Sequence, residues 1–171
     1  MKLQKKIFTL LALGILFATV GCATVQKGTE SSEQEAKALL DQYMQIVSGG
    51  DLAQIDKICT PDFNLNFVGN SVFPPIVGLE ALKRWRVGVR TAFPDMNVKT
   101  DETIIKGDRI IALFTLTGTN TGPGQWAPTG KKIFIEGVSI GRIVDGKLDE
   151  QLIYYNYAAL LRQVGFTFTP P

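Results

Sequence analysis

Two glutamates are the side chains in this sequence best suited to acid–base chemistry. Glu136 and Glu150 each alternate with apolar residues, as inward-facing positions of a strand do. A carboxyl group that faces an apolar interior is desolvated, which raises its pKa and makes it a usable general base. Simple alternation places Leu152, Tyr154 and Asn156 on the face of Glu150, with Tyr154 as a hydrogen-bond donor. Each glutamate can instead be structural, and a β-bulge would break the alternation.

The sequence contains no histidine. A Ser–His or Cys–His nucleophile, an imidazole base and a histidine metal site are therefore excluded. There is also no CxxC pair, no P-loop and no GxGxxG motif after a strand, so we expect no cofactor. Asp145, Asp149 and Glu150 could hold a metal ion through carboxylates alone, but a solvated turn explains their grouping better. We expect no metal site.

Alternating runs predict the strands that must position these side chains. They span residues 98–105, 109–119, 131–143 and 147–155, and a shorter run lies at residues 63–67. Tight turns are expected at Lys106-Gly107-Asp108 and at Asp145-Gly146. Asp-Gly is a strong hairpin signal because both positions of a two-residue turn need positive φ, which Gly tolerates. The long runs therefore predict an antiparallel meander.

Helical patterns precede this meander. Apolar residues recur at helical spacing over residues 36–47, 51–58 and 78–93, and a short apolar helix follows Asn156. Helices followed by an antiparallel meander predict an α+β fold with the helices packed on one face of the sheet.

The predicted helix over residues 78–93 carries both apolar and basic residues. Trp85 lies on its apolar stripe, and we expect it to pack in the core. We interpret Lys83, Arg84, Arg86 and Arg90 as the solvated face of the same helix.

Short motifs follow one another through the second half of the chain. They are Phe93-Pro94-Asp95, Lys106-Gly107-Asp108, Pro128-Thr129-Gly130-Lys131, Asp145-Gly146-Lys147 and the run from Leu160 to Gly165. In this order they resemble the SnoaL-like polyketide cyclase, or ester cyclase, branch of the NTF2-like fold. The resemblance implies a cone, in which a curved antiparallel sheet packs on about three N-terminal helices and a short C-terminal helix around an interior pocket.

The resemblance also implies where a site would lie. Polyketide cyclases of this type bind a hydrophobic ester in the cone and close a ring with a pocket Asp and neighbouring His groups. The Asp position falls on Asn156 here, and the His positions fall on Asn120 and Asn66. An amide forms hydrogen bonds but does not titrate near neutral pH, so these residues cannot supply an acid–base step. The same shape without that step indicates a pocket that binds a small hydrophobic molecule.

Alternative roles exist for the residues implied at this site. Asn156 directly precedes the last helix, where Asn is a preferred N-cap, and Asn120 lies in a Thr-Asn-Thr-Gly turn that it can stabilise locally. Trp126 lies in a Gly- and Pro-rich loop and is expected at the pocket mouth. Together with Asn66 and Tyr154, these residues are the candidate ligand contacts.

The first 21 residues have the three parts of a secretory signal. Lys2, Lys5 and Lys6 precede an apolar stretch over residues 7–20, and Gly21-Cys22 resembles a bacterial lipobox in which the cysteine is diacylated. We expect a signal peptide over residues 1–21, lipidated Cys22 with a tether over residues 22–32, and one domain over residues 33–171. An ordinary signal peptide with a nearby cysteine is the alternative.

Processing would anchor the mature chain to the cell envelope through its lipid. In a bacterium with two membranes we expect the outer one, because Ala23 follows the cysteine. Removal of Lys2, Lys5 and Lys6 from 18 Lys and Arg leaves 15 against 16 Asp and Glu, so no basic excess indicates a nucleic-acid partner. Cys59 would then have no partner for a disulfide, and we expect it to be a small buried packing residue.

Three classes of function fit these observations. The first is a lipid-anchored protein that binds a small hydrophobic molecule without chemistry. The second is a cyclase or isomerase that uses Glu150 or Glu136, with Tyr154 as a donor. The third is an interaction module that forms a homodimer through the outer face of its sheet, with the apolar tail over residues 166–171 packed across the interface.

Overall fold

The computed structural model describes residues 32–69, 72–125 and 127–168. The chain divides between Glu35 and Ala36, and the sheet and its core belong to the part from Ala36 onward. The predicted signal peptide, Cys22, the tether before residue 32 and Trp126 lie outside the described residues.

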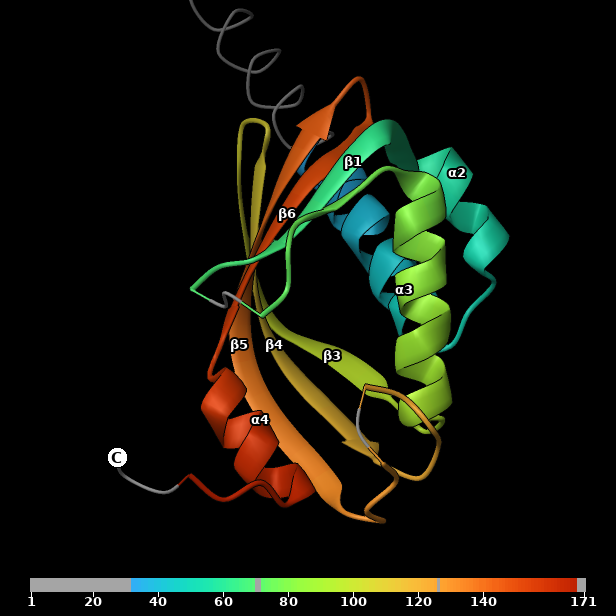
Figure 1. Cartoon of the computed structure of the whole chain (residues 1–171). Helices are drawn as coiled ribbons and strands as arrows, with labels where there is room; N and C mark the ends of the chain where they lie inside the picture. The colour runs from blue at the N-terminus through green and yellow to red at the C-terminus, as the bar shows by residue number, and fades with distance from the viewer. Residues whose placement is uncertain (1–31, 70–71, 126, 169–171) are drawn as a thin grey trace, which may run out of the picture. The chain divides into compact units, whose positions relative to one another are not determined.

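Six strands form one curved, open sheet in the order β2-β1-β6-β5-β4-β3 (Figure 1). Consecutive antiparallel pairs join β3 (Asn97–Lys106), β4 (Arg109–Thr119), β5 (Lys132–Val144) and β6 (Lys147–Tyr155). The predicted meander is therefore confirmed, with ends that differ by one residue at most.

The other edge of the sheet was predicted only in part. β1 (Cys59–Phe67) contains the short run predicted at residues 63–67 but begins earlier. It pairs in parallel with β6 and antiparallel with the two-residue β2 (Ile76–Val77), which the sequence did not predict. Parallel pairing brings β1, from the start of the domain, against its last strand.

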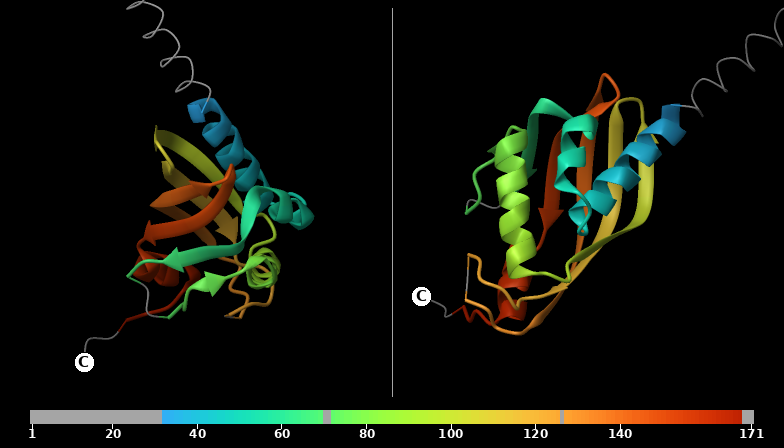
Figure 2. Two further views of the ribbon diagram at one scale, coloured as in Figure 1. Left: turned by 90° about the horizontal axis from the view of Figure 1, so that it is seen from above. Right: turned by 90° about the vertical axis from the view of Figure 1, so that its right-hand side faces the viewer.

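Helices cover one face of this sheet (Figure 2). They are a helix over residues 36–47, the short η1 (Leu52–Gln54) and α2 (Ile55–Ile58), and α3 (Leu79–Ala92). Each coincides with a predicted helical pattern, which confirms the α+β arrangement. Within the described ranges, no helix combines the length and the apolar character needed to span a bilayer.

The core lies between these helices and the inner face of the sheet. Tyr43, Ile55, Phe63, Leu65 and Leu82 are each no more than 1% exposed. They come from both helices and strands, so burying them holds the two layers together. Each large apolar side chain of this kind stabilises the fold by about 1.5–3 kcal/mol.

The hairpin between β5 and β6 has the predicted turn. Asp145 and Gly146 have φ values of 49° and 73°. Asp145 is the one non-glycine residue with positive φ among the described residues, and this conformation is the one that a tight two-residue hairpin requires.

A last helix, α4 (Tyr157–Val164), completes the edge of β5. β6 pairs with β5 from Gly137 onward and leaves the first residues of β5 unpaired on that side. There the side-chain amide of Gln163 forms hydrogen bonds with the backbone of Phe134. The Phe134 backbone N–H donates to Gln163 Oε1 at 2.6 Å, and Gln163 Nε2 donates to the Phe134 carbonyl at 2.9 Å. The helix thus satisfies backbone groups that a further strand would otherwise pair.

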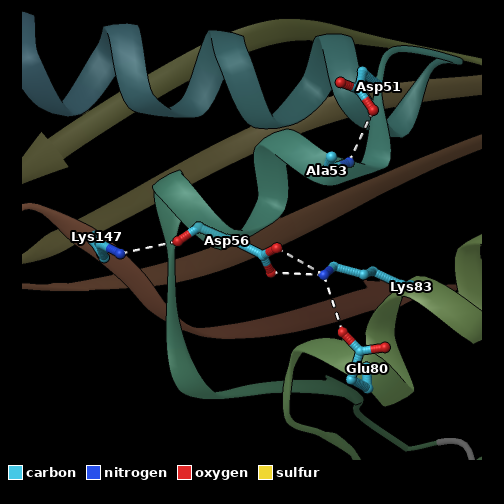
Figure 3. A network of polar contacts seen from close by, with 6 residues as sticks. All are labelled: Asp51, Ala53, Asp56, Glu80, Lys83 and Lys147. Atoms are coloured by element: carbon cyan, nitrogen blue, oxygen red, sulfur yellow. Dashed lines mark hydrogen bonds and ion pairs between the residues drawn. The ribbon is translucent and has the colours of Figure 1, made fainter.

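Polar contacts hold α2 between α3 and the start of β6 (Figure 3). Lys83 Nζ lies 2.7 Å from Asp56 Oδ1 and 3.0 Å from Glu80 Oε1, and Lys147 Nζ donates to the Asp56 carbonyl at 3.0 Å. Asp51 caps η1 by accepting a hydrogen bond from its backbone. Exposed ion pairs contribute only about 0–1 kcal/mol each to the free energy of folding. These contacts therefore fix the orientation of α2 but add little to the stability of the domain.

Small residues occupy the inner face of β5 where the sheet curves. Gly137, Ser139 and Gly141 alternate there, and Ser139 is 2% exposed. The ring of Phe114 on β4 lies against Gly137, where a Cβ atom would be only 2.5 Å from Phe114 Cζ. The absence of a side chain at residue 137 therefore sets the position of an aromatic ring of the inner face.

The substitution Gly137→Ala is expected to destabilise the domain by about 1–3 kcal/mol, the typical cost of overpacking. Its methyl group would lie 2.7 Å from the Tyr154 carbonyl oxygen as well as against Phe114, and a backbone atom cannot easily move away. Gly141→Ala is the matched control, because its Cβ would meet nothing closer than Leu148 Cδ2 at 3.5 Å. Urea unfolding of both variants measures the difference, and equal midpoints would contradict the expected clash.

Candidate functional site

A cavity of about 470 Å³ lies between the helices and the inner face of the sheet. Small-molecule sites in proteins typically enclose about 300–1,000 Å³. The side chains that line this cavity are mostly apolar. They come from the helix over residues 36–47, from α3 and α4, and from β5 and the strands on both sides of it. Gly124 and Gln125 line it from the loop between β4 and β5. Its size and lining suit a small, largely apolar molecule.

Five aromatic rings form one wall of the cavity: Phe67, Phe73, Trp85, Tyr155 and Tyr157. Their neighbouring centroids lie between 5.3 Å, for Phe67 and Trp85, and 6.3 Å, for Tyr155 and Tyr157. Trp85 packs against the core as predicted, and it also lines the cavity. Tilted and edge-to-face contacts at such distances hold the rings in defined positions.

Arg86 on α3 is the one cationic side chain among the described lining residues, and only 4% of it is exposed. Its Nη2 donates a hydrogen bond to the Tyr43 hydroxyl at 2.9 Å. Its guanidinium carbon lies 4.7 Å from the centroid of the Trp85 ring and 5.6 Å from that of Tyr43. A permanent positive charge is thus buried among aromatic faces.

The prediction that Arg86 and Arg90 lie on a solvated face of the helix is wrong. Arg86 lines the cavity, and Arg90 is half-buried with its Nη2 donating to the carbonyls of Ile46 and Gly50. A sequence signal for Arg86 exists. It follows Leu82 by four residues, and side chains at that spacing share one helix face.

Gln151 projects into the cavity from the sheet because of a bulge in β6. Arg142 pairs with Glu150 and the next residue of β5 pairs with Leu148, so Asp149 is an extra residue on β6. The bulge shifts the inward positions, and both Leu148 and Gln151 are buried, at 3% and 5% exposure.

The same bulge makes the predicted face of β6 wrong. Glu150, Leu152 and Tyr154 lie on the face opposite the cavity, which alternate residues beginning with Gln151 line instead. Glu150 Oε2 lies 3.3 Å from Arg109 Nη1, and Tyr154 is 41% exposed. Neither is therefore placed for chemistry inside the cone.

Glu136 and Asn66 also face away from the cavity. Glu136 is exposed and lies opposite Thr115, whereas its neighbour Ile135 is 4% exposed and lines the cavity. Asn66 is half-buried in β1 and pairs in register with Leu152 of the outer face. The prediction that Glu136 faces the interior is wrong, because both faces of β5 carry apolar residues and alternation alone could not distinguish them.

Asn120 is fully buried and organises the loop after β4. Its Oδ1 accepts hydrogen bonds from the Thr129 backbone N–H and hydroxyl, both at 3.1 Å, and its Nδ2 donates to the Ala92 carbonyl at 3.4 Å. Its own carbonyl accepts from the Gly130 N–H at 2.8 Å. These contacts fit the turn-forming role, and Asn120 positions the loop that carries Gln125 without itself lining the cavity.

Asn156 is the N-cap of α4. Its Oδ1 accepts a hydrogen bond from the Ala159 backbone N–H at 2.9 Å, and its side chain is exposed. The capping role is confirmed. Contact between Asn156 and a ligand stays a prediction, and it would take place outside the described cavity lining.

The titratable groups of the described lining are Arg86 and three tyrosines, Tyr43, Tyr155 and Tyr157. Burial raises the pKa of each tyrosine hydroxyl. At neutral pH these groups are thus hydrogen-bond donors and one fixed cation. The arrangement can bind and orient a polar group, but none of the three tyrosine hydroxyls exchanges a proton near neutral pH.

The thiol of Cys59 has a structural role. Burial raises the pKa of the Cys59 thiol to about 12, which makes it unreactive and confirms its interpretation as a packing residue. No cluster of three or more His, Cys, Asp or Glu side chains is placed to hold a metal ion within the described residues.

Comparison with known proteins identifies the sequence family. Residues 37–164 match the family described as SnoaL-like polyketide cyclase. No curated protein sequence matches the chain significantly.

Solved structures share the fold. A protein described as a SnoaL-like polyketide cyclase from Jannaschia sp. CCS1 is 19% identical, with a TM-score of 0.69 over 81% of this chain and 94% of that one. TsrD from Streptomyces laurentii is 20% identical, with a TM-score of 0.67 over 77% and 96%. AclR from Streptomyces galilaeus, described as a hydroxylase, is 27% identical, with a TM-score of 0.65 over 80% and 85%. The open curved sheet with its helices is therefore the NTF2-like cone.

The first two solved structures consist almost entirely of this domain. The matched region makes up 94% and 96% of the first two chains, which fold with little else. We therefore expect residues 32–171 to fold on their own.

The substitution Asn156→Ala is expected to lower the free energy of unfolding by about 1 kcal/mol, because it removes the side-chain cap of α4. Asn156→Ser keeps a capping oxygen and is the control that should restore most of the stability. Thermal unfolding followed by circular dichroism measures both. If the serine variant is as unstable as the alanine variant, the cap is not the reason.

Proposed function

The chain belongs to the SnoaL-like polyketide cyclase family, and from that premise we propose that it binds a small, largely apolar molecule inside its cone. The observation that carries the proposal is the cavity of about 470 Å³ with its apolar and aromatic lining. A void of that size, if unused, would forfeit the close packing that stabilises protein interiors. A ligand that fills it would restore those contacts.

Binding without chemistry is favoured over ring closure by the placement of the acidic residues. Glu136 and Glu150 point away from the cavity, and the titratable groups of its described lining are tyrosines and Arg86. By the family resemblance, the position of the catalytic acid falls on Asn156, which caps a helix here. A general base near neutral pH is what the cyclase alternative needs, and neither a neutral phenol nor an arginine supplies one.

The proposal predicts that filling the cavity with a larger side chain weakens ligand binding. Leu116 on β4 lines the cavity. Leu116→Trp should therefore weaken binding of the apolar fluorophore N-phenyl-1-naphthylamine by about tenfold or more, which corresponds to a loss of about 1.4 kcal/mol of binding free energy. Leu113→Trp is the matched control, since Leu113 lies on the same strand but is 37% exposed on the outer face. Fluorescence titration of residues 32–171 measures both affinities.

The folded state of each variant is checked by thermal unfolding. Equal affinities in two folded variants, or no binding by the wild-type domain, would contradict a ligand site in the cone. Where the variants support the site, native mass spectrometry of the protein purified from its own host's envelope would give the mass of any retained natural ligand.

We also propose that the domain is exported and held at the cell envelope by a lipid on Cys22. The support is the sequence alone: the basic start, the apolar stretch over residues 7–20 and the small residue before Cys22. Several acyl chains together anchor a protein stably, whereas a single chain does so only marginally.

The anchor predicts that Cys22→Ser abolishes incorporation of tritiated palmitate into the chain. Cys59→Ser is the control, because Cys59 is buried in the folded domain and should leave labelling unchanged. A wild-type chain that is cleaved but unlabelled would indicate the ordinary signal peptide instead.

A further inference from the structure

Arg86 carries a charge that the fold itself leaves almost without polar partners. The side chain is 4% exposed, and no ion pair involving it occurs within the described residues. An arginine has five N–H donors. The hydrogen bond to the Tyr43 hydroxyl uses one, and Nε has no partner. Buried charges in proteins are normally paired, because desolvation is costly.

The aromatic rings around Arg86 compensate only part of this cost. The faces of Trp85 and Tyr43 attract the cation. They do not accept hydrogen bonds in the plane of the guanidinium, where its donors point. The open donors therefore require an acceptor that the described chain does not provide, in a place that the cavity makes accessible.

Arg90, one turn further along α3, shows what a structural arginine looks like in this fold. Its Nη2 donates to the Ile46 carbonyl and, at 2.7 Å, to the Gly50 carbonyl, at the end of the helix over residues 36–47. Burial, and then the nearby charge of Arg86, lowers the pKa of Arg90. A second positive charge thus adds to the field at this end of the cavity. Arg90 Nε, like that of Arg86, has no partner, but Arg90 Nη2 donates to two backbone carbonyls.

Gln151 supplies a second open polar group from the sheet side. It is 5% exposed, it lines the same cavity, and its Oε1 has no hydrogen-bond partner. The amide can offer either an acceptor or a donor to a bound molecule. Arg86 from the helix layer and Gln151 from the sheet are therefore two buried polar side chains, both incompletely bonded, within a mainly apolar cavity.

We infer that the ligand is an apolar carboxylic acid. Its carboxylate binds Arg86 and also contacts Gln151. A carboxylate matches the planar fork of a guanidinium and accepts two hydrogen bonds from it. The aromatic and aliphatic lining then holds the apolar body of the molecule. The inference rests on the proposed function, because it names the class of ligand that the cone takes.

The test uses two competitors of equal chain length that differ in charge. Residues 32–171 are loaded with N-phenyl-1-naphthylamine, which is neutral, and the probe is displaced with decanoate or with 1-decanol at neutral pH. Charged hydrogen bonds typically change affinity by about tenfold to a hundredfold. Decanoate should therefore displace the probe at a concentration lower than that of decanol by about tenfold or more.

Variants assign the preference to Arg86. Arg86→Met keeps similar length without charge, so decanoate should lose its advantage while decanol still displaces the probe. Arg86→Lys keeps the charge without the fork and should retain part of the preference. Arg84→Met is the control, because Arg84 is an exposed residue of the same helix, and it should behave as the wild type does.

The outcomes separate the two proposals. If the wild-type domain binds no probe, the proposed function fails and this inference fails with it. If the probe binds but both competitors displace it equally, only the carboxylate inference is overturned. Persistence of the preference in folded Arg86→Met would also overturn it. Because the wild-type comparison needs no variant, the test remains decisive even if Arg86→Met does not fold.

Discussion

Short residues on the inner face of β5 determine how closely other side chains can approach the sheet. Gly137, Ser139 and Gly141 put almost no volume on the concave side of the sheet, directly opposite the helices. Large side chains such as Phe63 and Leu82 are fully buried in the core. The sheet is curved and open (Figure 1), and the cavity lies between it and the helices. Protein interiors are close-packed: the ring of Phe114 takes the space beside Gly137, whereas Ser139 lines the cavity directly.

Two arginines of α3 divide the structural and binding roles between them. Arg90 donates to carbonyls at the end of the helix over residues 36–47, where helix carbonyls lack intrahelical partners and carry partial negative charge. It thereby fixes the helix layer. Arg86 has one phenolic acceptor, two aromatic faces and an open cavity. The fold keeps Arg86 in place through these contacts, yet it leaves most of its donors available.

The elements of the fold could be predicted from the sequence, because each rests on local periodicity. The strands of the meander, the Asp145-Gly146 turn and the cap at Asn156 need only neighbouring residues, and the structure has all of them. The parallel pairing of β1 with β6 could not be predicted in this way, because it joins distant segments.

The candidate site was harder to predict, since it depends on which face of each element points inward. The bulge at Asp149 moves Gln151 inside and Glu150 outside, and no local pattern marks it. Apolar residues on both faces of β5 concealed the orientation of Glu136. Arg86 was grouped by charge with its neighbours, although its spacing from Leu82 places it on the apolar face of the helix.

A fixed charge gives this cavity properties that a titrating residue would not. An arginine stays protonated at all physiological pH values, and the buried tyrosines of the lining have pKa values raised further by burial. The polarity of the cavity is therefore constant where a catalytic Asp–His pair would change charge. Constant polarity suits holding an anion, whereas ring closure needs a group that takes up and returns a proton. A fixed cation in the cone therefore fits the proposed binding role.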